Sequence, residues 1–247
     1  MRAVGISDVG KHRKNNEDAI FVPTDTDEIQ NLFLIADGMG GCNAGEIASN
    51  LAIEAFLKFV KKEGHQYTEE DVLDLLVGGI VACNKRVYEV ANTERNFADM
   101  GTTIVAATVQ QKKAYIAYVG DSRAYLFHKK ELIPLTVDHS YVMELVKAGK
   151  ITEEEARIHP KRNEITRAIG MGNFVEVDTY IQEMIKGDLL LLCTDGLTGM
   201  LEDKEMEEIL GKRISLEKKV QKLIDAANDR GGYDNVSLIL IDVGGKG

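Results

Sequence analysis

The chain has 247 residues, of which 44% are hydrophobic, and a formal net charge of −10 from 30 basic and 40 acidic residues. This composition is typical of a globular protein that can bury a sizeable core, and the acidic balance, with no basic stripe, argues against nucleic-acid binding. No linker or internal repeat divides the sequence, so we expect a single domain over residues 1–247.

Two further features of the composition concern location. No apolar run is long enough for a signal peptide or a transmembrane helix, so we expect no membrane association. The three cysteines are too few and too scattered for a disulfide framework, which suits the reducing cytoplasm. We therefore expect a cytoplasmic protein, and a monomer.

The first half of the chain has three strand patterns followed by two helix patterns. Strands are expected at residues 1–9 and 19–23 and at the apolar run Leu32–Ala36, which a glycine-rich turn follows. Apolar residues at helical spacing then predict a helix from about Ala44 to Lys62 and a second helix through Val72–Val90. Thr68 and Asp71 resemble a capping box that opens the second helix.

The second half contains mostly strands. Four short strands are expected at Thr103–Val109, Ala114–Val119, Ala124–Phe127 and Leu132–Leu135, and we interpret them as one antiparallel meander. A polar insertion of two short helices follows at about 138–170, the second opened by a capping box. Strands at Val175–Gln182 and Leu189–Cys193, a helix from Ser215 to about Asn228 and a strand at Val236–Val243 complete the chain. Clustered strands with segregated helices predict an α+β fold, with helices covering the outer faces of a sheet sandwich.

Five aspartates stand at the ends of predicted strands. They are Asp18, Asp37, Asp121, Asp195 and Asp234. Any one of them alone could simply be a turn residue or a cap, because Asp-Gly is a common turn dipeptide. A sheet brings such strand ends together, however, and most of the five have glycine neighbours that let the backbone approach a ligand closely.

A cluster of carboxylates has an electrostatic consequence. Two carboxylates about 4 Å apart repel by roughly 4 kcal/mol at an effective dielectric constant of about 20. Five in one pocket could not all remain ionised without cations, and an all-oxygen set selects Mg²⁺ or Mn²⁺. Two such ions can share a water and lower its pKa, which gives a nucleophile without Ser, Cys or His.

Six motifs in a fixed order resemble those of the type 2C protein phosphatases, a metal-dependent serine/threonine phosphatase family. They are Arg13 with Asn16-Glu17-Asp18, Asp37–Gly41, Gly101–Thr103, Gly120–Arg123, Thr194–Gly196 and Asp234-Asn235. The segment 138–170 is similar to the flap subdomain of bacterial members. The resemblance covers essentially the whole chain and implies a four-layer α-β-β-α sandwich, two antiparallel sheets flanked by helices, that hydrolyses phosphoserine and phosphothreonine.

The resemblance also implies a role for each site residue. Asp37 bridges two Mn²⁺ or Mg²⁺ ions, and the carbonyl of Gly38 binds one of them. Asp195 and Asp234 hold the other ion, Asp18 binds the metal shell, and Asp121 with Asp195 forms a possible third site. Arg13, Asp18 and Asp37 are the catalytic residues, and Arg13 holds the substrate phosphate. The implied partners are phosphorylated proteins and a cognate serine/threonine kinase.

Two positions depart from common patterns of the family. Met39 follows the Asp-Gly pair where many eukaryotic members have a histidine proposed as a general acid, so the general acid is unidentified. Cys42 stands where a second histidine is common, and it is either a small tolerated hydrophobic residue or a redox-sensitive thiol.

Two other functions compete with the phosphoprotein phosphatase. A catalytically dead scaffold of the same fold would have lost metal-site aspartates, whereas all five are present. A small-molecule phosphatase would show no activity on phosphoproteins.

Overall fold

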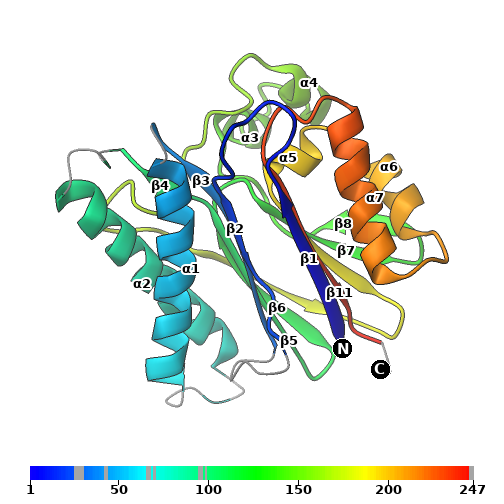
Figure 1. Ribbon diagram of the computed structural model, residues 1–247, viewed down its shortest axis with the longest axis horizontal. Coiled ribbons are helices and arrows are strands. Elements are labelled where there is room, and N and C mark those ends of the chain that lie inside the picture. The colour runs from blue at the N-terminus through cyan, green and yellow to red at the C-terminus, as the bar shows by residue number, and fades with distance from the viewer. Residues whose placement is uncertain are drawn as a thin grey trace.

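The structure, a computed structural model, describes residues 1–24, 31–41, 44–64, 68, 71–93, 97 and 99–244. Its described residues form two antiparallel sheets packed face to face, with helices covering both outer faces (Figure 1). Each layer follows from its sequence pattern: the central strands are apolar on both faces, and the helices bury one apolar stripe.

The first sheet has five strands in the order β1-β11-β10-β7-β8. Their bounds are Arg2–Asp8 for β1, Val236–Asp242 for β11, Leu189–Cys193 for β10, Arg123–His128 for β7 and Glu131–Pro134 for β8. Thus both ends of the chain contribute neighbouring strands.

The second sheet has the order β2-β3-β5-β6-β9, and a sixth short strand, β4, pairs with the end of β3. Their bounds are Asp18–Phe21 for β2, Leu32–Met39 for β3, Gly101–Thr102 for β4, Ile104–Gln110 for β5, Lys113–Val119 for β6 and Asp178–Glu183 for β9.

The helices divide between the two outer faces. Helices α1 (Ala44–Glu63) and α2 (Val72–Thr93) cover the six-stranded sheet, and α5 (Asp195–Thr198), α6 (Asp203–Leu210) and α7 (Leu216–Asp229) cover the five-stranded one (Figure 1). Three apolar clusters fill the spaces between the four layers. Phe56 lies in the first, Leu223 in the second, and Ile239 in the third, between the sheets. The predicted α-β-β-α sandwich is confirmed.

The expected four-strand meander is wrong. Strands β5 and β6 belong to the six-stranded sheet, whereas β7 and β8 belong to the other. The chain changes sheets at Gly120, whose φ of +110° suits glycine, and a Cβ there would lie 2.5 Å from Cγ2 of Thr103. Apolar periodicity could not reveal the crossing, because β5, β6 and β7 are buried on both faces.

The insertion at 138–170 contains α3 (Tyr141–Lys147) and α4 (Glu153–Ile158), at the top in Figure 1. The predicted capping box of Thr152 and Glu155 is present, and Ser215 caps α7 as expected. Helices α5 and α6 were not anticipated. At α2, the carboxylate of Asp71 accepts hydrogen bonds from the backbone and hydroxyl of Thr68, and the helix begins one residue later.

No helix in the described ranges combines the length and apolar character needed to cross a membrane.

Ile239 provides a test of the inter-sheet core. Replacing this fully buried side chain with alanine should reduce the free energy of unfolding by about 2–5 kcal/mol, because it leaves a cavity between the sheets. Urea unfolding measures the loss. Ile133→Ala on β8, where the side chain is 39% exposed, is the matched control and should cost much less. Equal losses in the two variants would contradict the assigned packing.

Candidate active site

The five predicted aspartates come from both sheets. Asp18 and Asp37 face one another across the β2–β3 pair. Asp121 lies at the crossing between β6 and β7, Asp195 opens α5 directly after β10, and Asp234 lies two residues before β11. The fold thus brings the ends of strands from the two sheets to one edge of the sandwich.

The five carboxylates interact electrostatically. Burial raises the pKa of Asp37 well above its ordinary value, and the charges of Asp18, Asp195, Asp121 and Asp234 raise it further. Each carboxylate therefore lies within interaction range of Asp37. This is the clustering that the strand-end positions predicted.

Asp18, Asp121 and Asp195 also have raised pKa values. The pKa of Asp18 is raised to about 7, first by burial and then by the charges of Asp195 and Asp234, while hydrogen bonds partly oppose the rise. The pKa of Asp121 lies well above its ordinary value, first because of burial and then because of Asp195 and Asp138. The pKa of Asp195 is also raised, mainly by burial and by Asp234.

Backbone contacts fix the position of Asp37. Its carbonyl accepts hydrogen bonds from the amide of Thr103 (2.8 Å) and the hydroxyl of Thr102 (2.8 Å), and its amide donates to the Thr103 hydroxyl (3.0 Å). At Gly38, a Cβ would lie 2.0 Å from the carbonyl oxygen of Gly45, so only glycine fits between β3 and α1. The Gly-Thr-Thr motif therefore holds the turn that carries Asp37.

Asp18 has one satisfied and one unsatisfied carboxylate oxygen. Its Oδ2 accepts a hydrogen bond of 3.0 Å from the Thr194 hydroxyl. Its Oδ1 is buried without a hydrogen-bond partner in the structure. A buried acceptor without a partner is costly, so this oxygen is a natural ligand for a cation.

Arg13 lies at the edge of the cluster. Its Nη2 donates to Oδ2 of Asp234 at 2.9 Å, and its Nη1 lies 3.7 Å from Oε2 of Glu17. The Arg13 side chain is 47% exposed, so one side of the guanidinium faces solvent.

Asn235 organises the loop that carries Arg13. Its side-chain amide donates to the carbonyls of Val9 and Asn15 at 2.9 Å each, and its Oδ1 accepts from the Glu17 amide at 2.8 Å. The sequence marked Asn235 only as part of a motif and missed this role. Its position beside Asp234 was the available signal.

A second polar network joins the cluster to the insertion. Arg123 makes two hydrogen bonds of 2.7 Å to the two carboxylate oxygens of Asp138. Nδ1 of His139 accepts from the Gly120 amide at 3.0 Å, and the His139 amide donates to the Gly120 carbonyl at 3.0 Å. Sequence reasoning assigned no role to Asp138 or His139, because nothing local shows which distant groups they meet.

The donor set has the chemistry that hard divalent cations prefer. It consists of the carboxylate oxygens of the five aspartates. Among the described residues, no three His, Cys, Asp or Glu side chains form a group that could hold an ion as they stand. Thr194 and Arg13 hold one oxygen each of Asp18 and Asp234. The orphaned Asp18 oxygen and the raised pKa values indicate that the site fits cations by charge and donor type.

Of the two residues that depart from the family pattern, Met39 and Cys42, the structure describes only Met39. Met39 lies at the end of β3 and pairs with Gly101 on β4. Cys42 lies outside the described residues, so its redox hypothesis stays a prediction.

The chain matches the family model described as protein phosphatase 2C over residues 10–237. It is 40% identical to the serine/threonine phosphatase stp of Listeria monocytogenes over 242 residues, which cover 98% of this chain and 96% of the relative. Among solved structures it is similar to the serine/threonine phosphatase Stp1 from Staphylococcus aureus, with a TM-score of 0.90, 36% identity, and coverage of 98% and 95%. It is also similar to the catalytic domain of PstP in complex with two manganese ions, with a TM-score of 0.85, 34% identity, and coverage of 98% and 97%.

The match covers most of the chain, and it agrees with the fold and the carboxylate cluster. The chain belongs to the type 2C family of metal-dependent serine/threonine protein phosphatases. The family expected from the sequence is confirmed.

The raised pKa of Asp18 gives a prediction for the metal-free protein. A carboxyl whose pKa is about 7 when folded, against an ordinary 3.8, favours folding most below about pH 4, and this contribution is lost as the pH rises to about 7. Asp18→Asn cannot ionise and should remove that part of the pH dependence. Urea unfolding in chelator at pH 5 and pH 7.5 measures the difference between variant and wild type. An identical pH dependence in both would contradict the shift.

The same measurement in excess Mn²⁺ adds a second expectation. A ligand at about 100 times its dissociation constant stabilises the folded state by roughly 2.7 kcal/mol. The gain should be larger at pH 7.5 than at pH 5, because protons compete for the carboxylates. Asp225→Asn, an exposed change on α7, serves as the control for loss of one carboxylate.

Proposed function

We propose that this protein hydrolyses phosphoserine and phosphothreonine in proteins at the five-aspartate site, with two Mn²⁺ or Mg²⁺ ions bound and a third site available. The observation that carries the proposal is the convergence of aspartates from both sheets at one edge of the sandwich, where one buried Asp18 oxygen has no partner and burial and mutual charge raise the pKa values of four carboxyls. Such a site needs cations to be ionised at neutral pH, and family membership supports divalent-metal dependence.

In this proposal the aspartates would share the ions among them. Asp37 would be a ligand common to two ions, the Gly38 carbonyl would bind one of these, and Asp195 and Asp234 would bind the other. Asp18 contributes its unpartnered oxygen to the metal shell. Asp121 with Asp195 forms the third site. When bound, the cations neutralise the carboxylates and act as a Lewis acid that activates water.

Arg13 is the proposed phosphate-binding residue. Its guanidinium is already held beside the cluster by Asp234 and Glu17, and half of it faces solvent. A planar fork of N–H donors matches two phosphate oxygens, which would hold the phosphoryl group with its phosphorus toward the aspartates. Asn235 fixes the loop, so it acts as a positioning residue.

The remaining parts of the proposal concern organisation and partners. We propose that the chain acts as one phosphatase domain whose flap, residues 138–170, lies beside the site. Its substrates are phosphorylated proteins, and the enzyme that it opposes is a serine/threonine kinase. We also propose a cytoplasmic monomer that binds neither nucleic acid nor membrane. The net charge of −10 supports the exclusion of nucleic acid.

Asp37 provides the direct test of the metal site. Asp37→Asn should reduce turnover of a phosphothreonine peptide by several orders of magnitude at saturating Mn²⁺, because it removes the charge shared by two ions. Asp74→Asn, an exposed change on α2, should leave turnover unchanged. Circular dichroism checks that both variants are folded. Near wild-type turnover of Asp37→Asn would refute the assignment, and activity on small phosphate esters alone would favour a small-molecule phosphatase.

Arg13 gives a separate prediction about substrate binding. Arg13→Ala should lower kcat/KM for the same peptide by about 10- to 100-fold, the range expected for one charged hydrogen-bonding group. Arg13→Lys should recover only part of the loss, since an ammonium cannot form the fork. Lys11→Ala in the same loop, whose side chain pairs with Asp229, is the control. If the Lys11 and Arg13 variants behave alike, Arg13 has no special role.

A further inference from the structure

A hollow lies at the end of the five-stranded sheet that is far from the aspartates. Its volume is about 480 Å³, and Arg2, Leu189 and Asp242 lie in its wall. These residues occupy the ends of β1, β10 and β11 opposite to the ends near Asp8, Cys193 and Val236. The same three strands therefore connect the hollow with the carboxylate site.

The rim of this hollow is basic. Four exposed cations surround it, namely Lys129 and Lys130 in the β7–β8 turn and Lys212 and Arg213 between α6 and α7. Within the part of the chain that the structure describes, no ion pair or hydrogen bond engages these four side chains. Among the lining residues Asp242 is the single carboxylate. The cluster is unusual in a chain whose net charge is −10.

Two further cations in the wall are already paired. Arg2 donates to Glu217 at 2.7 Å, and the ammonium of Lys219 donates to the carbonyl of Leu210. Burial lowers the pKa of Lys219, although the charge of Asp242 partly opposes that effect. These two residues shape the wall, and the four unpaired cations remain for a ligand.

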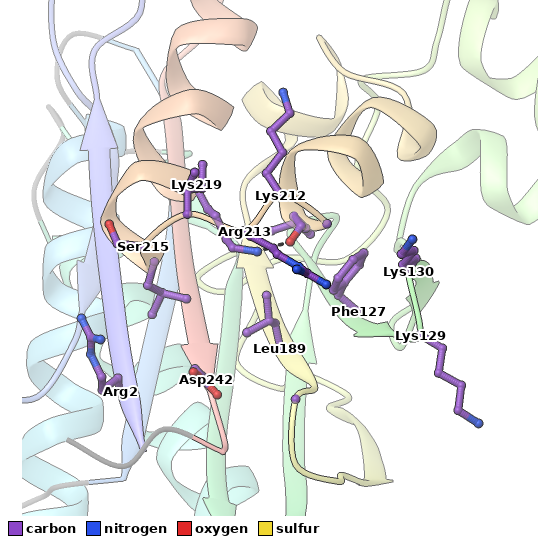
Figure 2. Close-up of a pocket in the computed structure, with 15 residues that line it drawn as sticks. Arg2, Phe127, Lys129, Lys130, Leu189, Lys212, Arg213, Ser215, Lys219 and Asp242 are labelled. Atoms are coloured by element: carbon purple, nitrogen blue, oxygen red, sulfur yellow. Dashed lines mark hydrogen bonds between the residues drawn. The ribbon is translucent and has the colours of Figure 1, made fainter.

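The floor of the hollow is apolar. Phe127, Leu189, Leu210 and Leu216 line it, and all four are buried. Figure 2 shows the Arg213 side chain directed toward Phe127, while Lys129 and Lys212 extend outward in opposite directions. A small anion would need donors that converge on it, whereas these cations are spread over the rim. Their arrangement favours an extended acidic segment with one apolar side chain seated on the floor.

We propose that the hollow is a docking site for an acidic segment of the phosphoprotein substrate, remote from the phosphorylated residue. The proposal rests on the proposed function. From Asp234 to Asp242 the chain advances eight residues, or about 26 Å at 3.3 Å per residue. An extended substrate segment of about 8–12 residues between the phosphorylated residue and the acidic patch spans that distance. Docking would raise the local concentration of the phosphorylated residue at the aspartates.

The test compares two phosphothreonine peptides that differ only in a distal segment. In one, four glutamates flank a leucine about ten residues from the phosphothreonine, and in the other, glutamines replace the glutamates. KM for the glutamate peptide should be about fivefold lower, the size expected for a few exposed charge pairs, with kcat unchanged. The advantage should decrease as salt is added.

Charge reversal at the rim locates the effect. Lys212→Glu with Arg213→Glu should abolish the difference between the peptides. Lys218→Glu with Lys222→Glu makes the same net-charge change at exposed positions of α7 that do not line the hollow, and it should preserve the difference. Both double variants should hydrolyse p-nitrophenyl phosphate like the wild type, which shows that the aspartate site and the fold are intact.

The outcomes separate this proposal from the proposed function. Equal KM values for the two peptides in the wild type, or a difference that survives the Lys212/Arg213 change, overturn the docking site. If neither peptide is hydrolysed, the proposed function itself is overturned. Two other polyanions are tested in the same way, a twelve-nucleotide single-stranded DNA and phosphatidylglycerol vesicles. If either binds more tightly than the glutamate peptide, and if that binding depends on Lys212 and Arg213, the docking proposal is overturned, because the surface then belongs to another polyanion.

Discussion

The repulsion among five partly or fully buried carboxyls is the constraint on which the active-site edge depends. Burial removes water from Asp18, Asp37, Asp121 and Asp195, and their mutual charge disfavours ionisation further. The protein offsets only part of this cost. Thr194 donates to Asp18, and Arg13 pairs with Asp234. The remaining negative charge is of the kind that divalent cations offset, which agrees with the metal dependence of the family.

The close approach of backbone segments determines where these carboxyls can lie. At Gly38 a Cβ would come within 2.0 Å of the carbonyl of Gly45, and at Gly196 a Cβ would come within 1.9 Å of the carbonyl of Asn235. In both cases a glycine directly follows a site aspartate. The glycine lets a neighbouring segment pack against the turn, so that the preceding carboxyl is held in place by backbone contacts on both sides. The glycine of each Asp-Gly pair therefore allows close backbone packing in addition to forming a turn.

The sequence predicted features that depend on neighbouring residues, but it did not predict features that depend on partners far away in the chain. Strand ends marked by aspartate, the helices α1 and α2 and the caps at Thr152 and Ser215 are local patterns, and they were predicted correctly. The assignment of β7 and β8 to the opposite sheet was missed, because strands buried on both faces carry no sign of their neighbours. The Arg123–Asp138 pair was missed for a similar reason. The positions of the five aspartates could be predicted, but the side chains that hold them could not.

The insertion at 138–170 combines a firmly held base with a loosely held body. At the base, His139 exchanges two hydrogen bonds with Gly120, and Asp138 binds Arg123 through both carboxylate oxygens. In the body, Val142 and Ala156 are the buried residues of α3 and α4, respectively. Asp138 also raises the pKa of Asp121, one residue from Gly120. Because the base is bonded to the turn that carries Asp121, a displacement of Asp138 or His139 changes the electrostatic field at that carboxyl. The base therefore couples the position of the insertion to the charge at Asp121.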